Sequence, residues 1–188
     1  MIEKSSKTVS FKRASGDELS AKMREGIRRE VLKSANAYLQ FLLDERNVPV
    51  WTGRLHNSFK PLYSRLKEDG IKTSFRKASP TSKAREYFEQ RNGEDSGGPI
   101  DADWSDQTRV FLPRKGRKTQ ITFSFYSDVP YYGANDLSSS KKRNLTKETP
   151  WGSQEAAMDV FQGEVARRLP NVVADIITRE LNSILLGG

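Results

Sequence analysis

The sequence predicts an α+β fold, with a long helix near the start, an antiparallel sheet of about four strands and a closing helix or helix pair. Two observations lead to this prediction. Apolar residues recur at intervals of three and four near both ends of the chain, and they alternate one by one in a segment between them. The length of 188 residues suits a single domain. A mean hydropathy of −0.72 predicts that long polar loops surround a modest core.

The chain begins with a polar arm over residues 1–14, which we expect to be disordered or ordered only by a partner. A single domain follows over residues 15–188. Its first helix starts at Ser15 or Asp17, where Glu18 completes a capping box, and ends near Arg46. One face of this helix is apolar: Leu19, Met23, Ile27, Val31, Ala35, Tyr38, Leu39 and Leu42. The opposite face is basic, which is more typical of a solvated surface than of a nucleic-acid site: Lys22, Arg24, Arg28, Arg29 and Lys33.

Strands are expected at Ser58–Arg65, Ile71–Phe75, Thr108–Leu112 and Thr119–Ser127. The last of these has the clearest pattern, because Ile121, Phe123 and Phe125 alternate with polar residues and therefore share one face. The order of the strands favours an antiparallel sheet packed against helices. Between the last two strands we expect a basic hairpin tip that contains Arg114, Lys115, Arg117 and Lys118.

In two long polar segments the apolar residues recur at no regular interval. Residues 77–107 are expected to form a flexible acidic loop, and residues 135–149 a second loop that contains Lys141, Lys142 and Arg143. The closing helix begins after Ser153. Pro170 is expected to interrupt it, which leaves open whether the chain ends in one helix or two.

Composition excludes most kinds of catalytic and metal chemistry. The chain has no cysteine and a single histidine, His56, so thiolate sites and two-histidine metal clamps cannot form within it. We find no serine-hydrolase elbow, P-loop or dinucleotide fingerprint, and we expect no catalytic residue, no metal and no cofactor. Asp101, Asp103 and Asp106 could bind Mg²⁺ or Ca²⁺ in principle, but they lie among flexible residues rather than at strand ends. His56 is expected in a turn, as a surface or hydrogen-bonding residue.

The charge is unevenly distributed along the chain. Residues 1–92 hold 20 Lys and Arg against 11 Asp and Glu, residues 93–148 hold 9 against 8, and residues 149–188 hold 3 against 5. Such a polar molecule could meet copies of itself head to tail, or it could bind nucleic acid. Because no recognition module is present, any nucleic-acid binding would be independent of sequence. No signal peptide or membrane-spanning stretch is found, so we expect a soluble cytoplasmic protein.

The segment that follows the first helix, Val48–Phe59, resembles the Pro-Val-x-Thr-Gly-x-Leu-x-x-Ser stretch of the tail-component, or tail-completion, proteins in the necks of tailed bacteriophages. Its motif residues are Pro49, Thr52, Gly53, Arg54, Leu55 and Ser58. In physical terms, Pro49 stops the helix and Gly53 permits a tight reversal, after which Leu55 and Phe59 seat the new strand in the core. Further along, Val129–Gly133 is similar to the Pro-Tyr-Ala segment of that family, and Pro150-Trp151 to its proline and aromatic residue before the last helix.

The resemblance implies a structural virion protein that is not an enzyme. Copies would form a six-fold or twelve-fold ring in the neck, assembled in the host cytoplasm, with adjacent neck, portal-side and tail proteins as partners and no membrane contact. Genomic DNA would pass through the lumen without specific binding, and we expect Asp101, Asp103 and Asp106 to face it. A protein partner would contact the basic residues: Arg114, Lys115, Arg117, Lys118, Lys141, Lys142 and Arg143. The alternative hypothesis is a sequence-independent nucleic-acid-binding protein.

Overall fold

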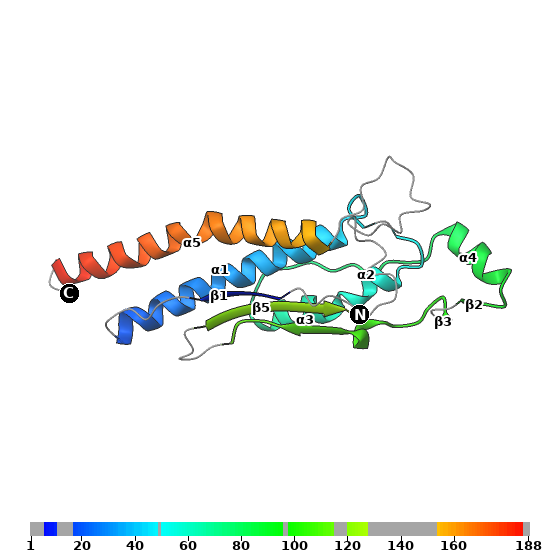
Figure 1. Ribbon diagram of the computed structural model, residues 1–188, viewed down its shortest axis with the longest axis horizontal. Helices are drawn as coiled ribbons and strands as arrows, with labels where there is room; N and C mark the ends of the chain where they lie inside the picture. The colour runs from blue at the N-terminus through cyan, green and yellow to red at the C-terminus, as the bar shows by residue number, and fades with distance from the viewer. Residues whose placement is uncertain are drawn as a thin grey trace.

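Two long helices lie side by side over a small antiparallel sheet, and shorter elements extend the molecule at one end (Figure 1). The computed structural model describes residues 6–10, 17–48, 50–95, 98–114, 120–127 and 154–185. The helices are α1 (Asp17–Leu43), α2 (Arg54–Ser58), α3 (Lys60–Glu68), α4 (Ser82–Glu89), α5 (Gln154–Leu185) and the 3₁₀ helix η1 (Ser105–Gln107). The strands are β1 (Ser6–Ser10), β2 (Glu94–Asp95), β3 (Gly98–Pro99), β4 (Thr108–Phe111) and β5 (Gln120–Ser127). The fold class is α+β, as the sequence predicts.

The long helices α1 and α5 run antiparallel and contact each other on both sides of Pro170. Before the proline, Arg168 Nη1 lies 3.7 Å from Glu30 Oε2. After it, Ile176 packs on Gly26, where an added Cβ would stand only 2.7 Å from Ile176 Cδ1. A proline inside a helix costs about 3 kcal/mol, and the contacts on either side offset this cost. The interruption expected at Pro170 is therefore wrong, and α5 is one continuous helix.

The larger sheet has three antiparallel strands in the order β1-β5-β4. Val9 of β1 pairs with Ile121, and Val110 of β4 pairs with Phe125. The alternation predicted for β5 is confirmed, since Ile121, Phe123 and Phe125 are all buried. Two of the four expected strands are thus present, as β4 and β5.

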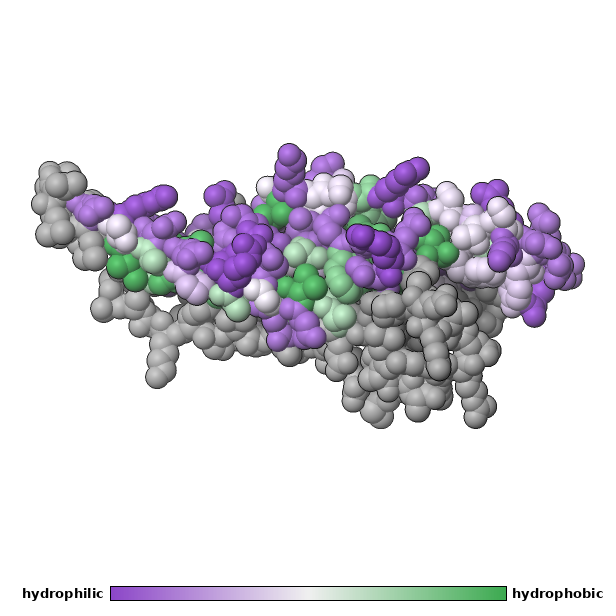
Figure 2. Space-filling view, turned by 90° about the horizontal axis from the view of Figure 1, so that it is seen from above, coloured by the Kyte–Doolittle hydropathy of each residue, from purple (hydrophilic) through white to green (hydrophobic). Residues whose placement is uncertain are grey.

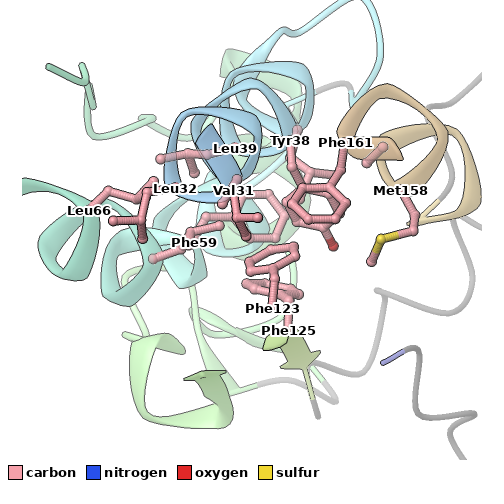
Figure 3. Packing of buried hydrophobic residues seen from close by; sticks show 14 of the residues in the cluster. Val31, Leu32, Tyr38, Leu39, Phe59, Leu66, Phe123, Phe125, Met158 and Phe161 are labelled. Atoms are coloured by element: carbon pink, nitrogen blue, oxygen red, sulfur yellow. The ribbon is translucent and has the colours of Figure 1, made fainter. Parts of the chain in front are cut away.

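Aromatic rings at the centre of the core join the helices to the sheet (Figure 3). The Tyr38 ring of α1 lies 5.4 Å from the ring of Phe123 and 5.5 Å from that of Phe125. Phe161 of α5 lies 4.7 Å from Phe123, and Phe59 lies 5.9 Å from Phe125. All five side chains are at most 2% exposed. Truncating one such buried ring typically costs about 3–5 kcal/mol, so this cluster fixes how α1 and α5 sit on β5.

The strand predicted at Ser58–Arg65 is wrong, because these residues form the end of α2 and most of α3. Phe59, Leu62 and Leu66 are buried together, and their spacing of three and four residues is helical. Pro61 stands in the first turn of α3, where its missing N–H removes no helical hydrogen bond.

The strand predicted at Ile71–Phe75 is also wrong, since this extended segment belongs to no sheet among the described residues. It is bound to α1 by side chains instead. Gln40 Nε2 donates to the carbonyl oxygen of Ser74 at 3.0 Å, and the Ser74 hydroxyl donates to Gln40 Oε1 at 3.2 Å. Phe75 packs on Tyr63 of α3 with ring centroids 5.4 Å apart.

The arm and the loops also differ from expectation. Residues Ser6–Ser10 of the arm form β1 and pair with β5, so the sheet has three strands rather than about four. Residues 77–107, expected to be a flexible loop, contain α4, β2, β3 and η1. Thr81 caps α4 by accepting a hydrogen bond from the Ala84 N–H at 3.2 Å. The expected loop 135–149 and the hairpin tip 115–119 lie outside the described residues.

The first helix ends at Leu43 rather than near Arg46. Asp44 Oδ1 accepts a hydrogen bond from the backbone N–H of Arg46 at 3.0 Å, a local turn that competes with helical hydrogen bonding. The hydrogen bond from the Arg46 guanidinium is the main cause that lowers the pKa of Asp44 to about 2.

Candidate functional site

The turn motif begins a helix instead of a strand. Pro49 lies outside the described residues. Thr52 Oγ1 accepts from the Arg54 N–H at 3.3 Å, and the Ser58 hydroxyl donates to the Leu55 carbonyl oxygen at 2.6 Å, so the motif binds largely to its own backbone. Gly53 has φ of 82°, and an added Cβ there would stand 2.5 Å from the carbonyl oxygen of Ala78. A side chain at this position would therefore be strained and would clash.

Among the motif residues, Arg54 contacts the residues that lie farthest along the chain. Its side chain is buried, and its guanidinium lies 4.8 Å above the Phe88 ring and 5.1 Å from the Trp104 ring. The same group donates to the carbonyl oxygen of Gly98 at 2.6 Å and to that of Pro99. One side chain thus ties α4, β3 and Trp104, the residue before η1, to α2. The sequence names Arg54 as a motif residue but gives no sign of these partners, which come from three separate elements.

A second set of contacts holds the same part of the chain. Asn57 Nδ2 donates to the Ala78 carbonyl oxygen at 3.1 Å, and the Ala78 N–H donates back to Asn57 Oδ1 at 2.9 Å. Next to it, the Thr81 N–H donates to the Trp51 carbonyl oxygen at 2.9 Å. The motif is therefore a joint that fixes α4 to the body of the molecule.

An exposed aromatic pair lies at the α4 end. We call Trp51, Tyr87 and Arg91 the aromatic surface. Trp51 is 47% exposed and Tyr87 37%, and their ring centroids are 6.3 Å apart in an edge-to-face arrangement. The Arg91 guanidinium carbon lies 3.8 Å from the Tyr87 ring centroid, a close cation–π contact. The sequence analysis did not select these residues, although a tryptophan inside the motif is a visible signal.

A pair of helix ends projects at the opposite end of the molecule (Figure 1). We call residues 17–26 of α1 and 167–185 of α5 the helical extension. The main core starts at Ile27 in α1 and ends at Val165 in α5, with Val173 packed at its edge. Beyond it, Pro170, Ala174 and Ile177 are exposed, Ile177 by 39%. Figure 2 shows hydrophobic residues at the surface of this end, on the left of the view.

Two of the three acidic residues expected to face a lumen, Asp101 and Asp103, have lysines beside them. Asp101 and Asp103 line a pocket of about 170 Å³ together with Lys60 and Lys77, and Asp106 lies exposed in η1. Hydrogen bonds from the backbone and hydroxyl of Ser105 lower the pKa of Asp103, and both lysines lower it further. Among the described residues, no group of three or more histidine or acidic side chains could hold a metal ion.

Of the basic residues expected to contact a partner, the described part of the chain includes only Arg114, which is exposed. The other six lie outside it: Lys115, Arg117, Lys118, Lys141, Lys142 and Arg143. Arg28, which the sequence places on a solvated face, is 4% exposed. Its Nε donates to the Pro113 carbonyl oxygen at 2.9 Å, and its other nitrogens bind Glu25 and Asp69. It joins α1 to the end of α3 and to the segment after β4.

His56 is buried rather than at the surface, which corrects the sequence prediction. It is 3% exposed in α2, and its ring lies 6.3 Å from that of Phe59. Nε2 has no hydrogen-bond partner within the described residues. Burial lowers the pKa of His56 to about 4, so the ring is neutral near pH 7.

Comparison with known proteins finds no matching family model, curated protein or solved structure. In the part of the chain that the structure describes, every helix is too short or too polar to traverse a lipid bilayer.

Proposed function

We propose that this chain is a structural virion protein of a tailed bacteriophage, which forms a ring in the neck and joins head to tail as a tail-completion protein. One observation carries the proposal: the molecule is elongated and exposes unlike apolar surfaces at its two ends (Figure 1). A closed ring needs two different, complementary surfaces on every copy, because each copy contacts its neighbours head to tail.

The turn motif supports the same function. Its residues are those that resemble the tail-completion proteins, and Arg54, Asn57 and Gly53 all fix the aromatic end to the body. We propose that the motif therefore has a mechanical task, which is to hold the α4 end in place. We propose that Asp101, Asp103 and Asp106 lie toward the lumen and that the basic hairpin residues meet a protein partner.

Ion pairs within the chain favour a connector over a nucleic-acid-binding protein. Part of the positive charge in the first half lies beside acidic residues: Arg28 beside Glu25 and Asp69, Lys33 beside Glu30, Arg46 beside Asp44, and Arg65 beside Glu68. Cations paired in this way are less available to phosphate groups.

Electron microscopy and mass measurement test the proposal. We expect the purified chain, alone or with portal-side and tail proteins, to form closed rings of six or twelve copies in negative stain. We also expect it in purified virions. A chain that stays monomeric with every neck partner and is absent from finished particles would refute the proposal.

Binding to a nucleic-acid duplex distinguishes the alternative function from the connector. A sequence-independent nucleic-acid-binding protein would shift any duplex in a gel, with an affinity that falls steeply as salt rises. The connector is expected to show weak binding at low salt and none near physiological ionic strength. Tight binding that survives in this range, without rings, would favour the alternative.

A further inference from the structure

We propose that the N-terminal strand β1 is exchanged between copies, so that Ser6–Ser10 of one copy pairs with residues 120–124 of the next. This inference rests on the proposed function, because it names a contact that joins neighbouring copies in the ring. The strand and the sheet edge that receives it are two different surfaces of every copy, as a head-to-tail ring requires.

β1 lies at an edge of the three-stranded sheet. The order β1-β5-β4 makes β5 the central strand, and β1 covers one side of it, with Ser6 opposite Ser124 and Ser10 opposite Gln120. Among the described elements, β1 makes extensive contact with β5 alone. The described core joins α1, α3, β5 and α5. The strand can therefore leave its own β5 while the contacts within that core persist.

The pairing of β1 with β5 depends mainly on the backbone. The sequence Ser-Lys-Thr-Val-Ser contains one large apolar residue, Val9, so the ladder of N–H and carbonyl groups is the main source of affinity. Extended segments bind to open sheet edges in this way. An identical strand from another copy can form the same ladder. Exchange of the strand therefore neither adds nor removes a contact.

The structure identifies a second copy as the partner, because the strand that fits this edge is the chain's own arm. All five residues of β1 pair in register with β5, and an arm of the same sequence needs no further complementarity. In a ring, neighbouring copies stand side by side. The arm of one copy then meets the β5 edge of the next at a high effective concentration.

The arm is attached where a neighbour can receive it. Six residues, 11–16, connect β1 to α1, and a chain of this length spans at most about 20 Å. α1 begins at Asp17 in the helical extension, beyond the core, which starts at Ile27. The start of α1 and the start of β5 lie toward the same end of the molecule (Figure 1). The arm can therefore reach a copy that packs at this end, but none farther away.

Disulfide trapping tests the exchange, because the chain has no cysteine of its own. Thr8 and Thr122 pair in register, and paired residues in antiparallel strands have Cα atoms within the range of a disulfide. Rings are assembled from a mixture of the single variants Thr8→Cys and Thr122→Cys, with neck partners where these are needed, and are then oxidised. We expect dimers in which peptide mapping finds the two different cysteines joined. Such dimers form only when the arm of one copy lies on another.

A chain that carries both substitutions distinguishes the two arrangements directly. Exchanged arms should give a ladder of covalent oligomers that ends at the ring size. Arms that stay on their own copy would give monomers closed by an internal disulfide, and this result would overturn the proposal.

Tyr126→Cys provides the matched control. Tyr126 lies on the same strand as Thr122 but four residues farther along, where it pairs with Arg109 of β4. Four residues of a strand span about 13 Å, so Thr8→Cys mixed with Tyr126→Cys should give no dimers. Equal yields from the two mixtures would overturn the proposal. Rings of Thr8→Cys and Thr122→Cys without dimers would also overturn it, but would leave the proposed function standing. Failure to form any ring, even with neck partners, would overturn both.

Proline substitution gives an independent measurement. Alternate N–H groups of an edge strand face its partner, so replacing both Thr8 and Val9 by proline removes at least one hydrogen bond of the ladder. We expect ring assembly to weaken roughly 100-fold by mass photometry, while the helical circular dichroism of the isolated chain persists. Replacing the same two residues by alanine keeps every N–H and should largely preserve assembly. Equal assembly by the proline and alanine variants would contradict the exchange.

Discussion

At the scale of single residues, Arg54 has the clearest consequence for stability. Arg54→Ala leaves the carbonyl oxygens of Gly98 and Pro99 without this donor and removes the stack on Phe88 and Trp104. We expect a loss of about 2–4 kcal/mol in the free energy of unfolding, measured by urea titration. Arg54→Lys keeps the charge but not the planar fork, so its loss should be nearly as large.

The control for this prediction is Arg46→Ala. Arg46 pairs with Asp44 at the surface, where ion pairs contribute little. Its urea midpoint should match that of the unsubstituted chain. An Arg54→Ala chain that is as stable as Arg46→Ala would show that the joint is held by its other contacts.

His56 makes the stability of the chain dependent on pH in a defined window. The folded ring has a pKa of about 4, whereas an unfolded histidine titrates near its ordinary value of 6.5. The unfolded state therefore binds the extra proton first, and stability falls as the pH drops from 6.5 to 4. The full loss is about 3 kcal/mol. His56→Gln should lose less over the same range, and parallel urea curves for both chains would contradict the prediction.

At the scale of elements, hydrophobic periodicity predicts the helices and strands that bury one face. The alternation around Phe123 and Phe125 predicts a strand because it has only one interpretation. A short apolar run fits the period of a strand and that of a helix, so Ser58–Arg65 reads as a strand although Pro61 is typical of a helix start. Alternation in Ile71–Phe75 predicted extended backbone but could not reveal that the partner is Gln40 of a helix.

Periodicity does not reveal contacts between distant segments, and this also explains which contacts of the candidate site the sequence leaves hidden. The motif could be located from local spacing, because Thr52, Gly53 and Ser58 bind their own neighbourhood. The role of Arg54 depends on Phe88, Gly98 and Trp104, which only the tertiary fold brings together. Burial of Arg28 has the same origin, since its partners Asp69 and Pro113 lie far along the chain.

At the scale of the whole molecule, the end of α5 lies outside the shared core and should open most easily. The core joins residues 27–42 of α1 to β5 and to the first part of α5, whereas residues 174–185 lie beyond the residues packed against it. Amide exchange depends on local opening, whose free energy ranges from near zero at frayed ends to the global value in a core. In the monomer we therefore expect fast exchange in residues 174–185 and slow exchange in Val31–Leu42 and β5. A copy in a closed head-to-tail ring buries two different surfaces, so on assembly we expect two separate segments to gain protection. Exchange followed by mass spectrometry measures this, and protection of a single segment would contradict a head-to-tail arrangement.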